Sequence, residues 1–247
     1  MARVLLIGES WFSHTIHQKG FDSFTTSEYT KDGEKFCQAL VANGHTVARI
    51  LAHEVADLVP DNIEGYADYD VVVISDVGAN SFLLGPQTIV RSEIVPNKLS
   101  VIANWVRAGG GLLMVGGYMS FTGIDGKARF GQSPLSDVLP VIMADHDDRV
   151  EVPEGVAAVR VGEHPATPDL DTDWPQMLGY NQVEAKPGAE VLATFGNDPL
   201  IVVGQAGAGR SAAFTSDLAP HWAPPEFLAW EGYGPLWHRL ITWLGRS

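Results

Sequence analysis

Short apolar runs without polar alternation mark the first half of the chain. Three such runs occur at residues 4–7, 71–74 and 112–115. An unbroken run of this length is typical of a strand that is buried on both faces, as in a parallel sheet. The pattern predicts strands at residues 3–8, 45–51, 70–75 and 111–115.

Three other segments repeat their apolar residues at helical spacing. Phe36, Leu40 and Val41 share a face within residues 33–43, and Gly44 follows them. Residues 96–108 and 233–244 carry similar stripes, and Gly109 stops the first of them. This spacing predicts three amphipathic helices.

The pattern changes after residue 121. Residues 122–199 are rich in Gly, Pro and Asp, with short strand-like runs at 157–161 and 191–195. Residues 200–204 and 211–215 read as a hairpin around a glycine-rich turn. No linker separates the halves, so we expect one domain over residues 1–247. Its fold class is α/β, a doubly wound, mostly parallel sheet with helices on both faces and an antiparallel β extension.

Residues 9–29 form a long segment between the first strand and the first helix. They hold five aromatic residues and two histidines, His14 and His17. A loop of this length is usually functional or disordered, and the aromatic content opposes disorder. We predict a loop that lies over the carboxyl end of the first strand.

The net charge of the chain limits the classes of partner that it is expected to bind. The formal net charge is −14 over 247 residues. A nucleic-acid or anionic-membrane partner would require a basic face, so neither is expected. No apolar window is long enough for a membrane span, and no signal peptide is recognisable, which favours the cytoplasm. The single cysteine, Cys37, excludes an internal disulfide and is expected to pack within the first helix.

Polar residues follow the ends of the predicted strands. Because the carboxyl ends of parallel strands share one edge, the segments after residues 8, 75, 115 and 215 should meet there. Glu9 ends the first strand, Tyr118 follows Gly116-Gly117, and His221 follows the last strand. These three are the candidate catalytic residues, suited to proton transfer. The candidate binding residues are Ser10, Trp11, Asp76, Gly78, Asn80, Gly117, Ser120 and Asp217.

Plainer interpretations stay open for these residues. Glu9 could cap a helix or pair with a lysine, and His221 could be an ordinary surface residue. Asp76 and Asn80 flank Gly78 in a turn that could supply N–H groups for an oxyanion hole, or could be turn residues only.

The chain lacks several common chemical signatures. An elbow enzyme presents Ser or Cys after its central strand, but the first hydroxyls here are Tyr118 and Ser120. His14 and His17 could hold a metal with Glu9 and His221, although the spacing is weak and no metal site is predicted. Residues 145–149 are interpreted as a solvated turn. No phosphate loop is present, and no cofactor is predicted.

Several stretches together resemble the class I glutamine amidotransferase-like superfamily, and more narrowly its bacterial cytoplasmic members. They are residues 4–11, 69–76, 109–117, 133–141 and 232–237. The resemblance implies a flavodoxin-like sheet and, for true amidotransferases, a Cys at the elbow, where this chain has Gly117 or Tyr118. Residues 209–221 also resemble the trehalose-utilisation family, which implies carbohydrate chemistry that uses His221.

Three functional hypotheses follow. The first is an amidotransferase-like protein without the elbow Cys, which binds or transforms a small polar metabolite at the carboxyl edge of the sheet. The second is a carbohydrate hydrolase or isomerase, with or without a metal. The third is a non-catalytic binding or assembly module. Aromatic residues within 220–230 would favour a homo-oligomer if they are exposed.

Overall fold

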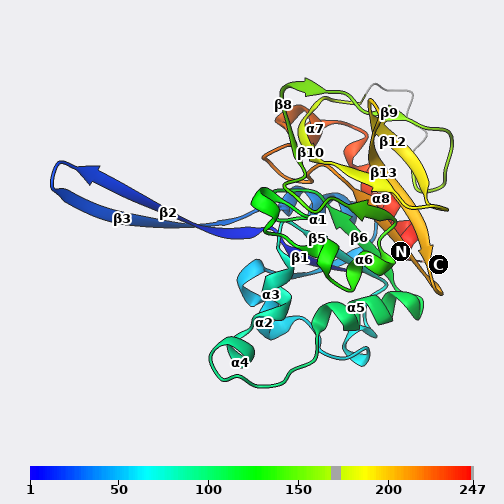
Figure 1. The fold of residues 1–247 in the computed structure, drawn as a ribbon. Coiled ribbons are helices and arrows are strands. Elements are labelled where there is room, and N and C mark those ends of the chain that lie inside the picture. The colour runs from blue at the N-terminus through cyan, green and yellow to red at the C-terminus, as the bar shows by residue number, and fades with distance from the viewer. Residues whose placement is uncertain (168–173, 246–247) are drawn as a thin grey trace.

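The computed structural model describes residues 1–167 and 174–245, and its largest element is an eight-stranded sheet (Figure 1). The strand order is β4-β1-β5-β6-β14-β13-β12-β9. The strands are β1 Arg3–Gly8, β4 Thr46–Ile50, β5 Val71–Ser75, β6 Gly111–Val115, β9 Val159–Arg160, β12 Glu190–Phe195, β13 Asp198–Ala206 and β14 Gly209–Phe214. The first five in the spatial order are parallel, and the last three pair antiparallel with their neighbours. The predicted fold class is confirmed.

Helices cover both faces of this sheet. They are α1 Glu34–Ala42, α2 Val55–Leu58, α3 Ala79–Leu83, α4 Pro86–Ile89, α5 Lys98–Arg107, α6 Leu135–Val138, α7 Pro225–Ala229 and α8 Tyr233–Leu244. Alternate residues of β1 face opposite sides: Val4 and Leu6 pack with α1, α7 and α8, whereas Leu5 and Ile7 pack with α2, α3, α5 and α6. Two cores therefore explain why the strands are apolar throughout.

The parallel strands place a topological switch point between β1 and β5. In chain order the five parallel strands lie 2-1-3-4-5, the flavodoxin-like arrangement. The connection from β1 to β4 runs through α1 on one face, and that from β5 to β6 runs through α5 on the other. Ligands in such folds bind outside the carboxyl ends of the strands at this point.

Residues 10–31 form a hairpin, so the prediction of a loop over the site is wrong. Strand β2, Ser10–Lys19, pairs antiparallel with β3, Asp22–Lys31, in an unbroken register. The hairpin projects far from the rest of the protein (Figure 1). Its β-branched and aromatic residues favour extended backbone. Gly20, at the first position of the two-residue turn, has a φ of 64° and allows the reversal.

The second half departs from the predicted extension in one respect. Strands β9, β12 and β13 extend the main sheet, but four strands form two separate pairs. These pairs are β7 Val141–Met143 with β11 Val183–Ala185, and β8 Arg149–Val156 with β10 Met177–Asn181. The small β8–β10 sheet brings residues 147–151 towards the carboxyl edge of the main sheet, where the Arg149 guanidinium lies over the Tyr118 ring.

The aromatic residues at 220–230 are not an exposed patch, so that basis for self-association is wrong. Trp222 and Phe227 are 2% and 1% exposed. Phe227 packs against Phe214 and Tyr233, with ring centroids 6.4 and 5.4 Å apart. Burial of these rings fixes the segment that carries His221. Among the described residues, no helix combines the length and apolar character that a bilayer crossing requires.

Candidate functional site

The sheet register brings the strand ends together at one edge. Gly8 pairs with Ser75, Ser75 with Val115, and Val115 with Phe214. The residues that follow are Glu9, Asp76, Gly116 and Thr215. Neighbouring strands lie about 4.8 Å apart, so these four positions form a short row across the switch point.

Two residues of this row have strained backbone. Glu9 and Asp76 have φ angles of 54° and 43°, which lie in the left-handed region that non-glycine residues rarely adopt. Gly117 and His221 also have positive φ, 143° and 149°. Each non-glycine residue in such a conformation costs about 1–3 kcal/mol, and such residues cluster at functional sites. A methyl group on Gly8 would lie 1.8 Å from the Ser75 carbonyl oxygen, so this close approach requires glycine.

Two buried carboxyl groups lie behind the edge. Glu9 and Asp217 are 1% and 2% exposed, and the Glu9 Oε1 atom has no hydrogen-bond partner. Burial, with the neighbouring Asp76, raises the pKa of Glu9 to about 8. Burial, together with Glu9 and Asp76, also raises the pKa of Asp217 well above its ordinary value. Both groups can therefore hold a proton near neutral pH, which suits them to donate hydrogen bonds or protons.

Asp76 joins this row to the segment after β6. Its Oδ1 accepts a 2.7 Å hydrogen bond from the Met119 N–H, and its own N–H donates to Ser120 Oγ at 3.1 Å. Burial raises the pKa of Asp76, while the nearby His221 ring opposes that shift. Asp76 thus lies within electrostatic reach of both Glu9 and His221.

The N–H groups around the elbow already have partners within the protein. The Gly117 N–H donates to Asn181 Oδ1 at 3.0 Å, and the Ala79 N–H donates to the Ala128 carbonyl at 2.8 Å. The Met119 N–H is held by Asp76. An acyl-transfer elbow leaves such donors free for the oxyanion. The Gly117, Ala79 and Met119 N–H groups are therefore not free to bind an oxyanion in this structure.

An aromatic stack lies beside the elbow. The rings of Tyr118 and His221 are parallel within 1°, with centroids 4.8 Å apart, and the Trp11 ring also stacks on His221, at 5.9 Å. The Arg149 guanidinium lies 4.7 Å from the centre of the Tyr118 ring. Burial and the Glu151 carboxylate raise the pKa of Tyr118, so its hydroxyl stays protonated. His221 is exposed, which makes this stack the part of the site that solvent reaches.

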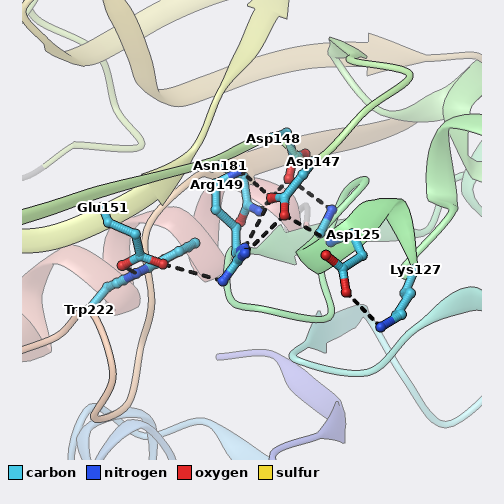
Figure 2. Close-up of polar contacts among 9 residues, drawn as sticks. Asp125, Lys127, Asp147, Asp148, Arg149, Glu151, Asn181 and Trp222 are labelled. Carbon is cyan, nitrogen blue, oxygen red and sulfur yellow. Dashed lines mark hydrogen bonds and ion pairs between the residues drawn. The ribbon is translucent and has the colours of Figure 1, made fainter.

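Residues of the β8–β10 sheet hold the stack in place. Figure 2 shows Arg149 between two carboxylates, at 2.9 Å from Asp147 and 3.5 Å from Glu151. Arg149 keeps the pKa of Asp147 well below its usual range. Glu151 in turn accepts a 3.0 Å hydrogen bond from Trp222 Nε1–H, next to His221. These contacts link β8 to the segment that follows β14.

Asp148 anchors the loop after β6 and corrects the interpretation of residues 145–149. It is 3% exposed and accepts hydrogen bonds from the Thr122 and Gly123 N–H groups and from Asn181 Nδ2–H, at 2.9, 2.8 and 2.8 Å. Asn181 Oδ1 in turn accepts a hydrogen bond from the Gly117 N–H, so Asn181 connects Asp148 to the elbow. Asp145 and His146 are exposed, so the solvated-turn prediction holds only for them. Nothing in the local sequence signals the long-range partners of Asp148.

The remaining candidate binding residues divide into two groups. Ser10 and Ser120 are buried. Their Oγ atoms accept hydrogen bonds from the backbone N–H groups of Ala52 and Asp76, at 2.9 and 3.1 Å respectively. Gly78 and Asn80 line a surface depression of about 500 Å³ together with Met119 and basic residues of the 125–132 segment. No described contact joins Asn80 to the aromatic stack. The structure thus brings together Glu9, Tyr118 and His221 with Trp11, Asp76, Gly117 and Asp217, whereas Asn80 lines the depression beside Met119.

The loop histidines do not reach this site. His14 and His17 lie along the projecting hairpin, where their rings contact Ser27 Oγ and Thr26 Oγ1 at 2.8 and 3.0 Å. The alternative in which they share a metal with Glu9 and His221 has no support in this geometry. Within residues 1–167 and 174–245, no group of three or more His, Cys, Asp or Glu residues is placed to hold a metal ion. Cys37 is buried in α1, and burial raises the pKa of its thiol.

Two solved structures are similar to this chain over almost its whole length. Cytoplasmic Protein STM3548 from Salmonella typhimurium is 45% identical, with 99% of this chain and 100% of that chain covered and a TM-score of 0.96. Cytoplasmic Protein STM1381 from Salmonella typhimurium LT2 is 44% identical, with the same coverage and a TM-score of 0.95. A ThuA-like protein from Parabacteroides merdae is 12% identical, covers 99% of this chain and 90% of that chain at a TM-score of 0.57, and shares the fold alone.

The search of curated proteins gives no match. A family model described as "Putative glutamine amidotransferase" matches residues 3–246, which include every strand of the main sheet and every candidate site residue. The chain therefore belongs to this glutamine amidotransferase-like family.

Proposed function

We propose that this protein binds a small polar metabolite at the carboxyl edge of β1 and β5 and acts on it by proton transfer, without a thiol nucleophile. The observation that carries the proposal is the meeting of Glu9, Asp76 and Asp217 from three strand ends, two of them in strained backbone. The pKa of each of these carboxyl groups is raised above its ordinary value. Such shifts are typical of acid–base groups in active sites. We also extend to this chain the cytoplasmic location named for its two Salmonella relatives.

Each candidate residue has a distinct role in the proposal. Tyr118 and His221 meet the ligand first, because their stacked rings face solvent. The Tyr118 hydroxyl donates a hydrogen bond, and His221 exchanges a proton with the ligand. Glu9, whose pKa of about 8 keeps most of it protonated at neutral pH, supplies or takes up a second proton. Burial, together with the negative charge of Asp76, maintains that raised pKa.

A thiol-dependent glutaminase is disfavoured by two independent features. Cys37 is buried within α1 with a raised pKa, which makes it a poor nucleophile. The Met119 N–H beside the elbow already donates to Asp76, so it is not free for an oxyanion. We expect no release of ammonia from glutamine, and the Cys37→Ala variant should behave like the wild type. Glutamine hydrolysis that disappears in Cys37→Ala would contradict the proposal.

Thermal-shift titration with amino acids, their amides, hydroxy acids and sugars tests the binding part. At least one class should raise the melting temperature of the wild type. Tyr118→Phe and His221→Ala should each remove most of that shift, while they leave the melting temperature of the free protein within a few degrees. Tyr29→Phe and His14→Ala are matched controls on the hairpin and should keep the full shift. The absence of any stabilising class, or equal shifts in all four variants, would refute the proposal.

A further inference from the structure

The β2–β3 hairpin, residues 10–31, is a projecting arm whose contacts with the rest of the protein lie at its base. The Ala52 N–H donates to Ser10 Oγ, the Trp11 ring stacks on His221, and Phe12 and Tyr29 pack around His53. Beyond this base the two strands extend away into solvent (Figure 1). An isolated two-stranded ribbon is marginally stable in water, because it has no third strand and no packed face.

Large apolar side chains are exposed along this arm. Ile16 is 73% exposed and Phe21, at the tip, is fully exposed. Phe12, Phe24 and Tyr29 are each between 41% and 56% exposed. The register places Phe12, Ile16 and Tyr29 on one face of the ribbon and Phe24 on the other. Exposed apolar residues on both faces of so thin an element indicate that another molecule covers it.

The outer edges of the arm are open to further strand pairing. The arm contains no proline and no bulge, and its lysines lie only at the strand ends, Lys19 and Lys31. Proteins usually protect exposed edge strands with such features. Both strands therefore present unblocked backbone N–H and C=O groups along most of their length.

Charge indicates which partner fits the arm. Residues 10–31 contain two lysines, one aspartate and one glutamate, so their formal charge is zero, whereas the whole chain carries −14. Repulsion between two copies opposes contact through most of the surface. The neutral arm is a region where two copies can meet without that repulsion.

The size of the arm also suits association with an identical arm. A stable interface uses about 20–30 residues on each side, and the arm supplies two ten-residue strands and a two-residue turn. A two-fold pairing of identical arms would present the same surface from both copies, as closed dimers require.

The arm is a shared feature of the relatives rather than a peculiarity of this chain. The two Salmonella structures match 99% of this chain at TM-scores of 0.96 and 0.95. Values this high leave little room for an arm of this length to point elsewhere. The two relatives are only 45% and 44% identical to this chain. A thin ribbon that keeps its direction across such sequence differences is expected to be fixed by a partner.

We infer that the β2–β3 arm is a self-association surface, which pairs with the same arm of a second copy of this chain. The contact extends the two-stranded ribbon into a larger sheet and covers Phe12, Ile16, Phe21 and Phe24. Because β2 begins at Ser10, directly after Glu9, the same contact also steadies the base of the arm, where Trp11 meets His221. The inference does not depend on the chemistry of the site.

Light scattering coupled to gel filtration, together with sedimentation across a concentration series, tests the inference on the full chain. The wild type should have twice the chain mass of 26.7 kDa. The double substitution Ile16→Glu and Phe24→Glu should raise the dissociation constant at least about tenfold, since it introduces like charges on both faces of the contact. The matched control, Ile89→Glu with Ile94→Glu, makes the same charge change at exposed positions outside the arm and should stay dimeric.

A truncation separates loss of the contact from damage to the fold. Replacement of residues 13–28 by Asn-Gly between Phe12 and Tyr29 removes most of the arm but keeps its base. We expect a monomer whose circular dichroism shows an intact α/β body. A wild type that is monomeric at every concentration would overturn the inference, as would a truncated chain that remains dimeric or a control that dissociates equally. A monomeric wild type whose arm binds a different protein would equally show that the second-copy assignment is wrong.

Discussion

The peptide bond between Glu9 and Ser10 separates two regions that are opposites in almost every respect. On one side, the carboxyl edge is buried, irregular and strained, with φ angles of 54° and 43° at Glu9 and Asp76. On the other side, the arm is regular and exposed, with ten residue pairs in unbroken register. The edge is held by the protein's own long-range contacts, whereas the arm has almost none beyond its base.

This difference shows that regular secondary structure and support from tertiary contacts are separate properties. Strained backbone at Glu9 persists because neighbouring strands and α1 determine its position from several directions. The arm has favourable dihedral angles but little to pack against, so its order depends on another molecule. The edge is suited to chemistry because its geometry is fixed without a ligand, and the arm is suited to association because its surface is not yet covered.

The largest expected effect comes from removal of the anchor behind the edge. Asp148→Ala would leave the Thr122 and Gly123 N–H groups and the Asn181 amide without an acceptor in a buried environment. We expect the free energy of unfolding to fall by about 3–5 kcal/mol, measured by urea denaturation. Asp145→Ala, three residues earlier and exposed, should change stability by less than about 0.5 kcal/mol. Similar losses in the two variants would show that Asp148 does not anchor the edge.

The pH dependence of stability gives the second test. The pKa of Glu9 in the folded protein, about 8, exceeds its value of about 4.3 in an unfolded chain, so the folded state retains a proton that the unfolded state releases. This contribution is fully present below about pH 4 and is lost as the pH rises to about 8, at up to about 1.4 kcal/mol per pH unit. Glu9→Gln removes it, so the stability of the variant relative to the wild type should rise by a few kcal/mol between pH 5 and pH 8.

The matched control for this titration lies on the arm. Glu28→Gln makes the same chemical change at an exposed position, and its pH profile should follow that of the wild type. Denaturation at several pH values provides the measurement for both variants. If Glu9→Gln keeps the wild-type slope, then Glu9 is ionised in the folded protein and cannot act as the proposed acid.

The smallest effect is expected for single polar substitutions near the tip of the arm. Phe21→Ser should change the free energy of unfolding of the monomeric body by less than about 0.5 kcal/mol, because the Phe21 side chain contacts no core. Calorimetry measures this change in the free energy of unfolding, with the wild type and Phe21→Ser both at a concentration where they are monomeric. A fall of several kcal/mol in the free energy of unfolding would mean that the arm packs on the body and is supported by tertiary contacts, as the edge is.

Much of the edge could be predicted from sequence, because it depends on local patterns. Unbroken apolar runs located β1, β5 and β6, and the residues that directly follow them, Glu9, Asp76 and Gly116, had to share an edge once the strands were parallel. The hairpin could have been recognised too. The length of residues 9–29 favoured a functional loop, whereas Gly20 between two β-prone runs was the more informative signal.

The supporting network could not be predicted in this way. Asp148, Arg149 and Asn181 lie far along the chain from the residues that they hold, and the turn around residues 145–149 has an ordinary polar composition. Their roles depend on how the small β8–β10 sheet packs over the carboxyl edge. The burial of Trp222 and Phe227 likewise depends on neighbours that the local sequence does not reveal.

By itself, the sequence determined the parallel sheet, the helices on its two faces and the row of polar residues at one edge, because apolar periodicity is a local consequence of burial. Only the tertiary structure decided which carboxyl groups are buried together, which N–H groups are already occupied and that residues 10–31 project as an arm. Those properties arise from contacts between distant segments, and no local pattern encodes them.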